Sequence, residues 1–396
     1  MNICIICFRF RSENLNKQPW RYILELAKGI REEHVGVKVI SNGTKSESQV
    51  VDGVEVRYVR ASDRTLHSSQ ETLSVLQQEN PDVIIMLIGL LDLLKRKKRL
   101  GKPIIAIMTS PLYTVSQILR LGAGEFLSHS RVIYIHLLTA ILPRLCLGRG
   151  AKFYDHFVVL SEANKTRLLR GGVSSQKVTV LRPGIHDSDL TLPSLSEVKR
   201  MKAEFSPDGS PIILYFGSPL TLRGTDTLLE AFAQVTPPSR LLILSRLDDQ
   251  LAISEHQKLQ RMIRDYGLTD RVIVKSSLLD RSELKTQVCA ADVVCLPFKL
   301  VISDMPITIL EAMALGKPIV STCLDGIPEL LSGRGAVVRP GQRDKLAKMI
   351  GQLITNTELA GRLGELARNF MLTYPRWNEQ SRKMLTIVEE ISGHNI

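Results

Sequence analysis

The strongest constraint on the fold is an alternation of short apolar segments with helical patterns in the second half of the chain. Segments typical of buried strands lie at Ile212–Phe216, Leu241–Leu244, Asp270–Val274, Val293–Pro297 and Ile319–Thr322. Apolar residues at helical spacing lie between them, as in Ser282–Ala290. Strands that alternate with helices form parallel sheets, whose ligands bind at the carboxyl ends of the strands. The pattern therefore predicts an α/β fold with a ligand site beyond those strand ends.

The first half of the chain begins with a second α/β pattern. Strands are expected at Ile3–Phe8, Val37–Ser41 and Val54–Val59, with a helix around Ile23–Arg31, which is typical of a Rossmann-like domain. The loop RFRSENLNKQPW after the first strand lacks the glycines of a dinucleotide-binding fingerprint. A chain of 396 residues, with 44% hydrophobic residues, is long for one core and fits two globular domains.

The segment SDMPITILEAMALGKPIVSTCLDGIP places a carboxylate in an apolar helix. Pro306 fits the first turn of that helix, and Gly316 ends it before the strand at 319–322. The free N–H groups of a helix N-terminus suit a phosphate, and Glu311, about one turn in, can accept from a sugar hydroxyl. A nucleotide sugar would satisfy both. On this segment alone, Glu311 as a solvent-facing residue of an amphipathic helix remains an equal alternative.

Three segments carry a family resemblance. FGSPLTLRGTDTLLEAFAQV, ADVVCLPFKLVISDMPITILEAMALGKPIVSTCLDGIPELL and YPRWNEQSRKMLTIVEEI resemble the donor-binding half of a retaining glycosyltransferase of family 4, from about Phe153 to the C-terminus. The resemblance implies the GT-B architecture, in which two Rossmann-like domains with parallel sheets face a central cleft. It predicts an acceptor-binding domain at 1–188, a donor-binding domain at 189–375 and a C-terminal helix at 376–396 that crosses back to the first domain.

The resemblance also implies roles for particular residues. Glu311 is expected to bind the ribose of the donor and Arg223 its diphosphate. Ser303 stands where the family has a glutamate, and Asp304, one residue on, is the candidate to supply the missing carboxylate, so Arg223 and Asp304 are the catalytic candidates. The predicted donor-binding set is Gly217, Ser218, Arg223, Ser303, Asp304, Met305, Pro306, Ile307 and Glu311.

A second departure from the family lies at the end of the 212–216 strand, where Ser218 replaces a basic residue. Charge-assisted hydrogen bonds are the strong ones, so another cation has to face the phosphates. Lys17 and Arg21, in and after the first loop, are the candidates for that role from the other domain. Ser110 stands where the family often has a histidine, and it is expected on the acceptor side with them.

No metal site or cofactor is predicted. Cys4 and Cys7 lie three apart in one strand, so their thiols are expected on opposite faces of the sheet rather than as a redox pair. The sequence has no Cys/His cluster at zinc spacing. In the resembled family the leaving diphosphate is neutralised by side chains and a helix N-terminus.

The net charge of +12 is concentrated in the first half of the chain. Between Leu93 and Tyr154 the sequence has eleven Lys and Arg residues, including the run Lys95–Arg99, and one acid, Glu125. Basic and apolar side chains so interleaved, with the apolar segment Val132–Leu142 among them, suit the surface of an anionic bilayer. No segment has the roughly twenty apolar residues of a spanning helix, and MNICIICFRF has no signal-peptide pattern. The expected location is cytoplasmic, peripheral at the inner face of the membrane.

Other interpretations of this basic region stay open. Lys95–Arg99 alone fits an ordinary solvated helix end, and Val132–Leu142 alone fits a buried helix of the first domain. Nucleic acid, the rival partner for such charge, is not expected, because no aromatic stacking ladder accompanies the cations.

Together the patterns and the resemblance predict a retaining, hexosyltransferase-like glycosyltransferase. It would move a sugar from a nucleotide diphosphate sugar to a membrane-associated or lipid-linked glycan acceptor, and the leaving phosphate would take the acceptor proton. His129, His136 and His156 are then expected to be structural. The alternatives are a catalytically inactive GT-B subunit that binds or regulates a partner transferase, a GT-B epimerase or phosphorylase, and a lipid-binding scaffold.

Overall fold

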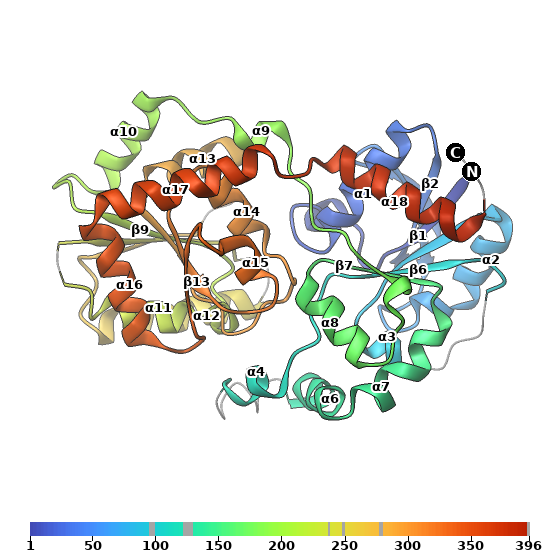
Figure 1. Ribbon diagram of the computed structural model, residues 1–396. Coiled ribbons are helices and arrows are strands. Elements are labelled where there is room, and N and C mark those ends of the chain that lie inside the picture. The colour runs from blue at the N-terminus through green and yellow to red at the C-terminus, as the bar shows by residue number, and fades with distance from the viewer. Residues whose placement is uncertain (95–99, 122–129, 237, 248–249, 277–279, 394–396) are drawn as a thin grey trace.

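The computed structural model describes residues 1–94, 100–121, 130–236, 238–247, 250–276 and 280–393, and for residues 130–132 and 149 the backbone alone. Two domains lie side by side, each a sheet covered by helices on both faces (Figure 1). The predicted basic run Lys95–Arg99 and the acid Glu125 lie outside the described residues.

The first sheet has eight strands among the described residues, in the order β3-β4-β2-β1-β5-β6-β7-β8. All neighbours pair in parallel except the edge strand β3, which is antiparallel to β4. The strands are β1 (Asn2–Ile6), β2 (Gly36–Gly43), β3 (Glu47–Val51), β4 (Val54–Arg60), β5 (Val83–Leu87), β6 (Ile104–Met108), β7 (His156–Val159) and β8 (Val178–Val180). The helices of this half are α1 (Trp20–Glu32), α2 (Gln70–Glu79), α3 (Leu90–Leu94), α4 (Val115–Leu119), α6 (Ser130–Ile141), α7 (Pro143–Gly150) and α8 (Glu162–Arg170).

The second sheet is parallel throughout, with six strands among the described residues in the order β11-β10-β9-β12-β13-β14. This is the order of a doubly wound fold, with its switch point between β9 and β12. The strands are β9 (Ile212–Gly217), β10 (Arg240–Ser245), β11 (Val272–Lys275), β12 (Val293–Leu296), β13 (Ile319–Thr322) and β14 (Ala336–Val338). Its helices, with the link α9, are α9 (Asp187–Leu190), α10 (Leu195–Phe205), α11 (Thr225–Phe232), α12 (Gln250–Asp265), α13 (Arg281–Ala290), α14 (Ile307–Ala314), α15 (Ile327–Leu331), α16 (Arg343–Thr355) and α17 (Thr357–Leu372).

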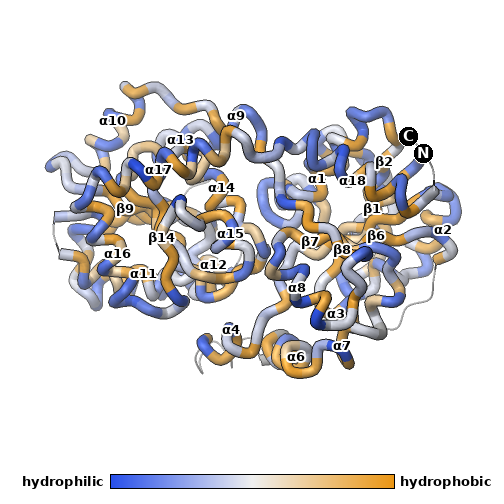
Figure 2. The backbone as a smooth tube through the Cα atoms, viewed as in Figure 1, coloured by the Kyte–Doolittle hydropathy of each residue, from blue (hydrophilic) through white to orange (hydrophobic). Residues whose placement is uncertain are grey.

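The central strands of both sheets are buried on both faces, which is why they are apolar throughout, whereas β4 alternates and the edge strand β3 is mostly exposed. Figure 2 shows the hydrophobic colour running along the strands. In β1 and directly after it, Ile5 and Cys7 belong to the core on one face, and Cys4 and Ile6 to the core on the other. The prediction that Cys4 and Cys7 are buried thiols on opposite faces is therefore confirmed.

The last helix, α18 (Trp377–Ser392), returns from the second domain and packs on α1 of the first (Figure 1). Trp377 meets the ring of Tyr22 edge-on at 5.6 Å between centroids. The two helices approach closely because Gly29 has no side chain: a Cβ there would lie 2.2 Å from the hydroxyl oxygen of Ser381. The α/β prediction with two parallel sheets is confirmed; the bounds 1–188, 189–375 and 376–396 stay a prediction.

A pair of matched substitutions tests the α1–α18 contact. Gly29→Ala should lower the free energy of unfolding by about 1–3 kcal/mol, because the new methyl group overpacks a closed helix interface. Gly351→Ala, in the interior of α16 where a Cβ would meet nothing within 4 Å, should instead raise it by up to about 1 kcal/mol. Urea denaturation measures both. Equal effects of the two variants would mean that the helices do not pack as closely as described.

Candidate functional site

A cleft of about 1700 Å³ lies where the carboxyl ends of the two sheets face each other. Its lining includes Phe8 and Ile88, beyond β1 and β5, from the switch point of the first sheet. From the second sheet it includes Gly217 and Phe298, beyond β9 and β12. Doubly wound folds bind ligands beyond the strand ends at the switch point. The switch points of both sheets therefore open into the same cleft.

The loop after β9 carries Arg223 to this cleft. Gly217 has φ 139°, a conformation that side chains rarely adopt, and a Cβ there would lie 3.0 Å from a terminal guanidinium nitrogen of Arg223. The guanidinium carbon lies 5.9 Å from the centre of the Phe298 ring. Gly224, at φ 80°, lets the loop press against the carbonyl of Pro297. These close contacts place a cation over the end of β9.

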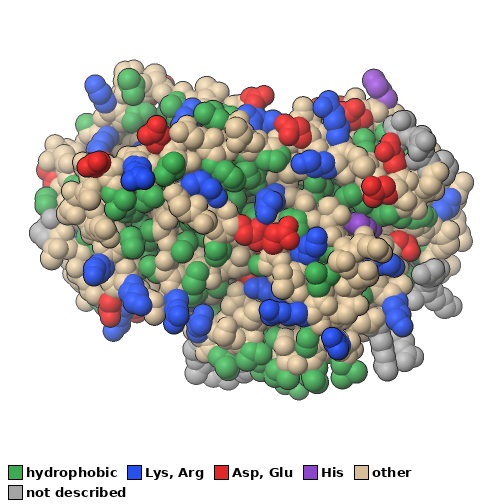
Figure 3. Space-filling view, in the orientation of Figure 1, with side chains coloured by type: hydrophobic (Ala, Val, Ile, Leu, Met, Phe, Trp, Pro, Cys, Tyr) green, Lys and Arg blue, Asp and Glu red, His purple; other side chains and the backbone are tan. Residues whose placement is uncertain are grey.

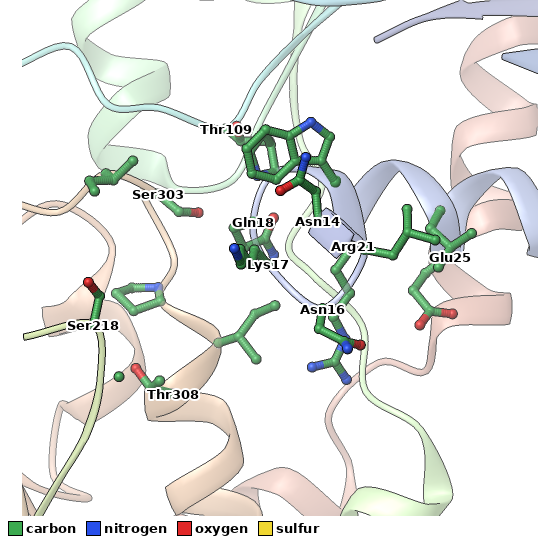
Figure 4. Close-up of a pocket in the computed structure, with 18 of the residues that line it drawn as sticks. Asn14, Asn16, Lys17, Gln18, Arg21, Glu25, Thr109, Ser218, Ser303 and Thr308 are labelled. Carbon is green, nitrogen blue, oxygen red and sulfur yellow. The ribbon is translucent and has the colours of Figure 1, made fainter. Parts of the chain in front are cut away.

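The N-terminus of α14 opens into the same cleft. Pro306 occupies the N-cap without a side-chain cap, and Ser303, Pro306, Ile307 and Thr308 all line the space. The hydroxyl oxygens of Ser303 and Thr308 are buried and have no hydrogen-bond partner among the described residues. Figure 4 shows Ser303 and Thr308 on one side with Ser218, opposite Lys17 and Gln18. Uncapped N–H groups beside unused hydroxyl donors suit an anionic ligand.

Glu311 forms an ion pair that crosses the cleft. Its Oε1 accepts a hydrogen bond at 3.1 Å from Arg21, on α1 of the first domain. The other terminal nitrogen of Arg21 lies 3.9 Å from Asp189, which also pairs with Arg281. Burial raises the pKa of Glu311, and the Arg21 cation opposes that shift. The carboxylate therefore lines the cleft rather than pointing to bulk solvent, a quarter of its side chain being exposed.

The first domain contributes the opposite wall. Lys17, Arg21 and Ser110, all predicted on this side, line the cleft. Gln18 was not predicted: the amide nitrogen and oxygen of its side chain are buried, and neither has a partner among the described residues. Thr308 was missed as well, although the predicted helix start at Pro306 already placed it in the first turn. The structure thus brings together most of the predicted donor-binding set.

Two predicted residues do not reach the cleft. Asp304 and Met305 are fully buried and absent from its lining. The reason lies in the backbone: the N–H of Asp304 donates to the carbonyl of Thr109 in the other domain, which turns Ser303 toward the cleft and Asp304 away from it. The carboxylate of Asp304 instead accepts from the hydroxyl of Ser161 at 2.6 Å. The prediction that Asp304 supplies the missing carboxylate of the cleft is thereby corrected.

Asp304 belongs to a buried polar contact between the domains. Burial, with the nearby carboxylates Asp325 and Glu329, raises the pKa of Asp304 to about 7, against the opposing effect of Arg167 and the Ser161 hydroxyl. Arg167 itself pairs with Asp325 across the same junction. Asp304 therefore lies in the contact between the domains, and its carboxyl group stays protonated over much of the acidic pH range.

The described histidines that the sequence singled out have structural settings, whereas His186 lines the cleft and its Nε2 lies 2.9 Å from Oε1 of Glu25. His156 lies in β7 and shares a 2.8 Å hydrogen bond with Thr179 of β8. His136 packs on the ring of Tyr113, and burial lowers its pKa to about 4. The third, His129, lies outside the described residues. Among the described residues no cluster of three or more His, Cys, Asp or Glu is arranged to hold a metal ion.

Comparison with known families gives two matches, one in each half of the chain. Residues 20–189 match the family described as Glycosyltransferase Family 4, and residues 210–356 match Glycosyl transferases group 1. The chain is 24% identical over 261 residues to the GDP-mannose-dependent alpha-(1-6)-phosphatidylinositol monomannoside mannosyltransferase of Mycolicibacterium smegmatis, covering 63% of this chain and 66% of that protein. The chain spans between 42% and 66% of the length of that protein and of two other curated relatives.

Solved structures resemble the whole chain. The sucrose-phosphate synthase of Thermosynechococcus elongatus superposes with a TM-score of 0.77 at 17% identity, covering 99% of both chains. Anabaena HepE, solved in complex with UDP, superposes with a TM-score of 0.74 at 16% identity, covering 98% of this chain and 100% of that one. At such identities the likeness shows the fold, and the predicted GT-B arrangement is confirmed.

The raised pKa of Asp304 predicts a pH-dependent stability. Between about pH 4 and pH 7 the folded chain keeps a proton that the unfolded chain has lost, so the free energy of unfolding should fall as the pH rises through this window. Asp304→Asn removes the charge and should be more stable than the wild type by about 1–3 kcal/mol at pH 8, with the gain shrinking toward pH 4.

Urea denaturation at several pH values measures this effect. Asp344→Asn, at an acid whose side chain is 82% exposed, is the control and should change neither the stability nor its pH dependence. An Asp304→Asn variant that is destabilised equally at every pH would contradict the assignment, because its loss would then come from the Ser161 hydrogen bond alone.

Proposed function

The chain belongs to the family 4, group 1 glycosyltransferases, and on that premise we propose that it transfers a sugar from a nucleotide diphosphate sugar with retention at the anomeric carbon. The observation that carries the proposal is the second-domain wall of the cleft. There Arg223, the uncapped start of α14 and the carboxylate of Glu311 line one space, and these are the groups that suit a diphosphate and a ribose.

In this proposal the diphosphate lies between Arg223 and the N-terminus of α14. The guanidinium can bind two phosphate oxygens at once, and the helix adds N–H donors and the positive end of its dipole. Ser303 and Thr308, whose hydroxyls have no partner in the part of the chain that the structure describes, complete this set of donors. As the bond to the sugar breaks, negative charge grows on the leaving diphosphate, and groups fixed in advance around it stabilise that charge.

The cation missing at Ser218 is supplied by the first domain. Lys17 and Arg21 both line the cleft from that side, and Arg21 already reaches Glu311. The acceptor enters beside Ser110 and Gln18, and its hydroxyl attacks on the face that the diphosphate leaves. The proton of that hydroxyl passes to the leaving phosphate. Asp304, the extra carboxylate, faces away from the cleft, and His186, which lines it, is paired with Glu25.

The acceptor in this proposal is membrane-associated or lipid-linked. The relative from Mycolicibacterium smegmatis is named for a phosphatidylinositol-based acceptor, and the excess positive charge of this chain lies in the acceptor-side half. The chain would then work at the inner face of the membrane as a peripheral protein. No helix among the described residues is both long and apolar enough to cross a bilayer.

Release of free nucleotide diphosphate tests the reaction. The purified chain is incubated with GDP-mannose, UDP-glucose and ADP-glucose in turn, with and without a membrane lipid extract. We expect one donor to be consumed faster when the extract is present, with the sugar recovered in the lipid fraction. Consumption of no donor under any condition would overturn the proposal.

A second candidate function is an inactive subunit that binds a partner transferase. Ser218 and Ser303 favour it, because each replaces a charged residue of the family pattern with a neutral one. Donor binding without turnover, together with a stable complex with another transferase, would select this candidate over the enzyme.

Glu311→Gln tests the ribose contact. Loss of hydrogen bonds to a charged acceptor costs about 1.5–3 kcal/mol, so affinity should fall about 10- to 150-fold. The loss should be the same for the nucleoside and for the nucleotide diphosphate, since both carry the ribose. Calorimetric titration measures both ligands, with Glu365→Gln, at an exposed position of α17, as the control. Unchanged affinity in Glu311→Gln would exclude the ribose role.

Arg223→Ala should give a different pattern from Glu311→Gln. Its guanidinium is proposed to bind only the diphosphate, so affinity for the nucleotide diphosphate should fall at least 10-fold while affinity for the nucleoside stays within twofold. Arg223→Lys should recover part of the loss, because an ammonium keeps the charge without the two-pronged geometry. An equal loss for both ligands would mean that Arg223 supports the loop rather than the phosphates.

A further inference from the structure

Helix α6 presents an apolar face to solvent. Tyr134, Leu138, Ile141 and Leu145 are 62%, 41%, 57% and 63% exposed. The spacing of four and three residues places Tyr134, Leu138 and Ile141 on one side of α6, and Leu145 follows in α7. Figure 3 shows hydrophobic side chains gathered along the lower edge of the molecule, over α6 and α7. We call these four residues the α6 stripe. An exposed apolar stripe this long indicates an interaction surface.

The stripe passes from α6 into α7 across a break in the helix. The N–H of Leu142 donates to the carbonyl of Leu138 at 2.9 Å, and the N–H of Cys146 to that of Leu142 at 3.1 Å. Between these bonds Leu142 has φ −121° and ψ 58°, which are not helical values, and Pro143 begins α7. Leu145, in the first turn of α7, extends the exposed apolar surface of α6 past the break.

The opposite side of α6 is buried against both domains. Ile133 packs with Ile118 of α4 and with Leu300, a residue of the cleft lining. The same cluster contains Leu121, Tyr113, Leu137 and Leu222. Leu222 precedes Arg223, and its carbonyl accepts from the N–H of Leu300 at 3.0 Å. The helix is thus fixed at the cleft by one face and leaves the other face uncovered.

The charged residues described around the stripe are positive. Arg120, at the end of α4, and Arg144, in α7, are both exposed. From Leu93 to Tyr154 the sequence contains a single acid, Glu125, which lies outside the described residues. An apolar stripe flanked by cations and free of described acids is complementary to a surface with negative headgroups over a hydrocarbon interior.

We propose that the α6 stripe docks on an anionic bilayer, with its apolar side chains in the headgroup boundary and Arg120 and Arg144 against lipid phosphates. At twelve residues α6 is much shorter than a spanning helix, so it lies in the plane of the surface. A protein partner is the less favoured occupant, since the stripe is a convex helix face with charge of one sign only on the described residues beside it.

Docking through the α6 stripe places the cleft next to the membrane surface. The helix that meets the lipid also packs on Leu222 and Leu300, next to Arg223, so the membrane surface lies close to the donor wall of the cleft. This consequence rests on the proposed function, because it says where a lipid-linked acceptor would enter. The docking itself requires no sugar transfer and can be measured without it.

Vesicle co-sedimentation of the full chain tests the proposal. The probe is vesicles of phosphatidylcholine with 30% phosphatidylglycerol, compared with pure phosphatidylcholine. The wild type should bind the anionic vesicles at least tenfold more strongly, and less so in 0.5 M than in 0.1 M salt. The double variant Ile141→Asn, Leu145→Asn should bind them at least tenfold more weakly than the wild type.

Two further variants make the result specific. Leu195→Asn, Leu251→Asn changes two apolar residues of the second domain that are 78% and 50% exposed, and it should bind like the wild type within twofold. Arg120→Ser, Arg144→Ser keeps the stripe and should weaken binding to the anionic vesicles at least threefold without affecting binding to neutral ones. Thermal melting checks that each variant is folded. If the Ile141→Asn, Leu145→Asn variant is not folded, the arginine variant alone tests the proposal.

The outcomes separate docking from catalysis. A wild type that stays in solution with anionic vesicles, or stripe and control variants that bind equally, would overturn the docking proposal even if the chain transfers sugar. Self-association of the wild type that the stripe variant abolishes would do the same, because the occupant would then be a second copy. Stripe-dependent binding by a chain that consumes no donor would uphold docking and reject the proposed function.

Discussion

The structure depends on a line of charges that joins the two domains, from Glu311 through Arg21 and Asp189 to Arg281. A partly buried carboxylate is stabilised by a cation that faces it, and the cation here comes from the other domain. The residue proposed for the ribose is therefore paired with an arginine of the first domain. A ribose must share or displace Arg21, and displacement would free that guanidinium at the position where a phosphate partner is needed. Donor binding and domain contact are then coupled through one arginine.

Local patterns predicted the second domain well, because its evidence is contiguous in sequence. Pro306 marked the start of α14 and the apolar run at 319–322 coincides with β13, so Glu311 was placed correctly from spacing alone. Asp304 was misplaced for a reason that no local pattern contains. Its backbone is fixed by Thr109 and its side chain by Ser161, residues of the other domain. Gln18 was not predicted for a similar reason. Its polar side-chain atoms are buried without a partner among the described residues, which is a property of the folded cleft.

The apolar segment around 132–142 forms a helix with two different faces. A buried helix and a membrane-facing one were the alternatives, and α6 has one buried face and one exposed apolar face. It is hydrophobic on all sides, unlike a typical surface helix. The basic residues could be counted in the sequence, but their position beside an uncovered stripe required the fold.

The return of α18 has a consequence for how the chain is made on the ribosome. The hydroxyl of Ser381 meets the carbonyl of Leu26, 355 residues earlier, in a contact that covers one side of α1. Until that helix leaves the exit tunnel, the first domain has all its strands but keeps an apolar side of α1 open to water. Synthesis at 5–20 residues per second makes this an interval of tens of seconds. The N-terminal domain thus begins folding first and finishes last, and its nascent form is a natural client for chaperones.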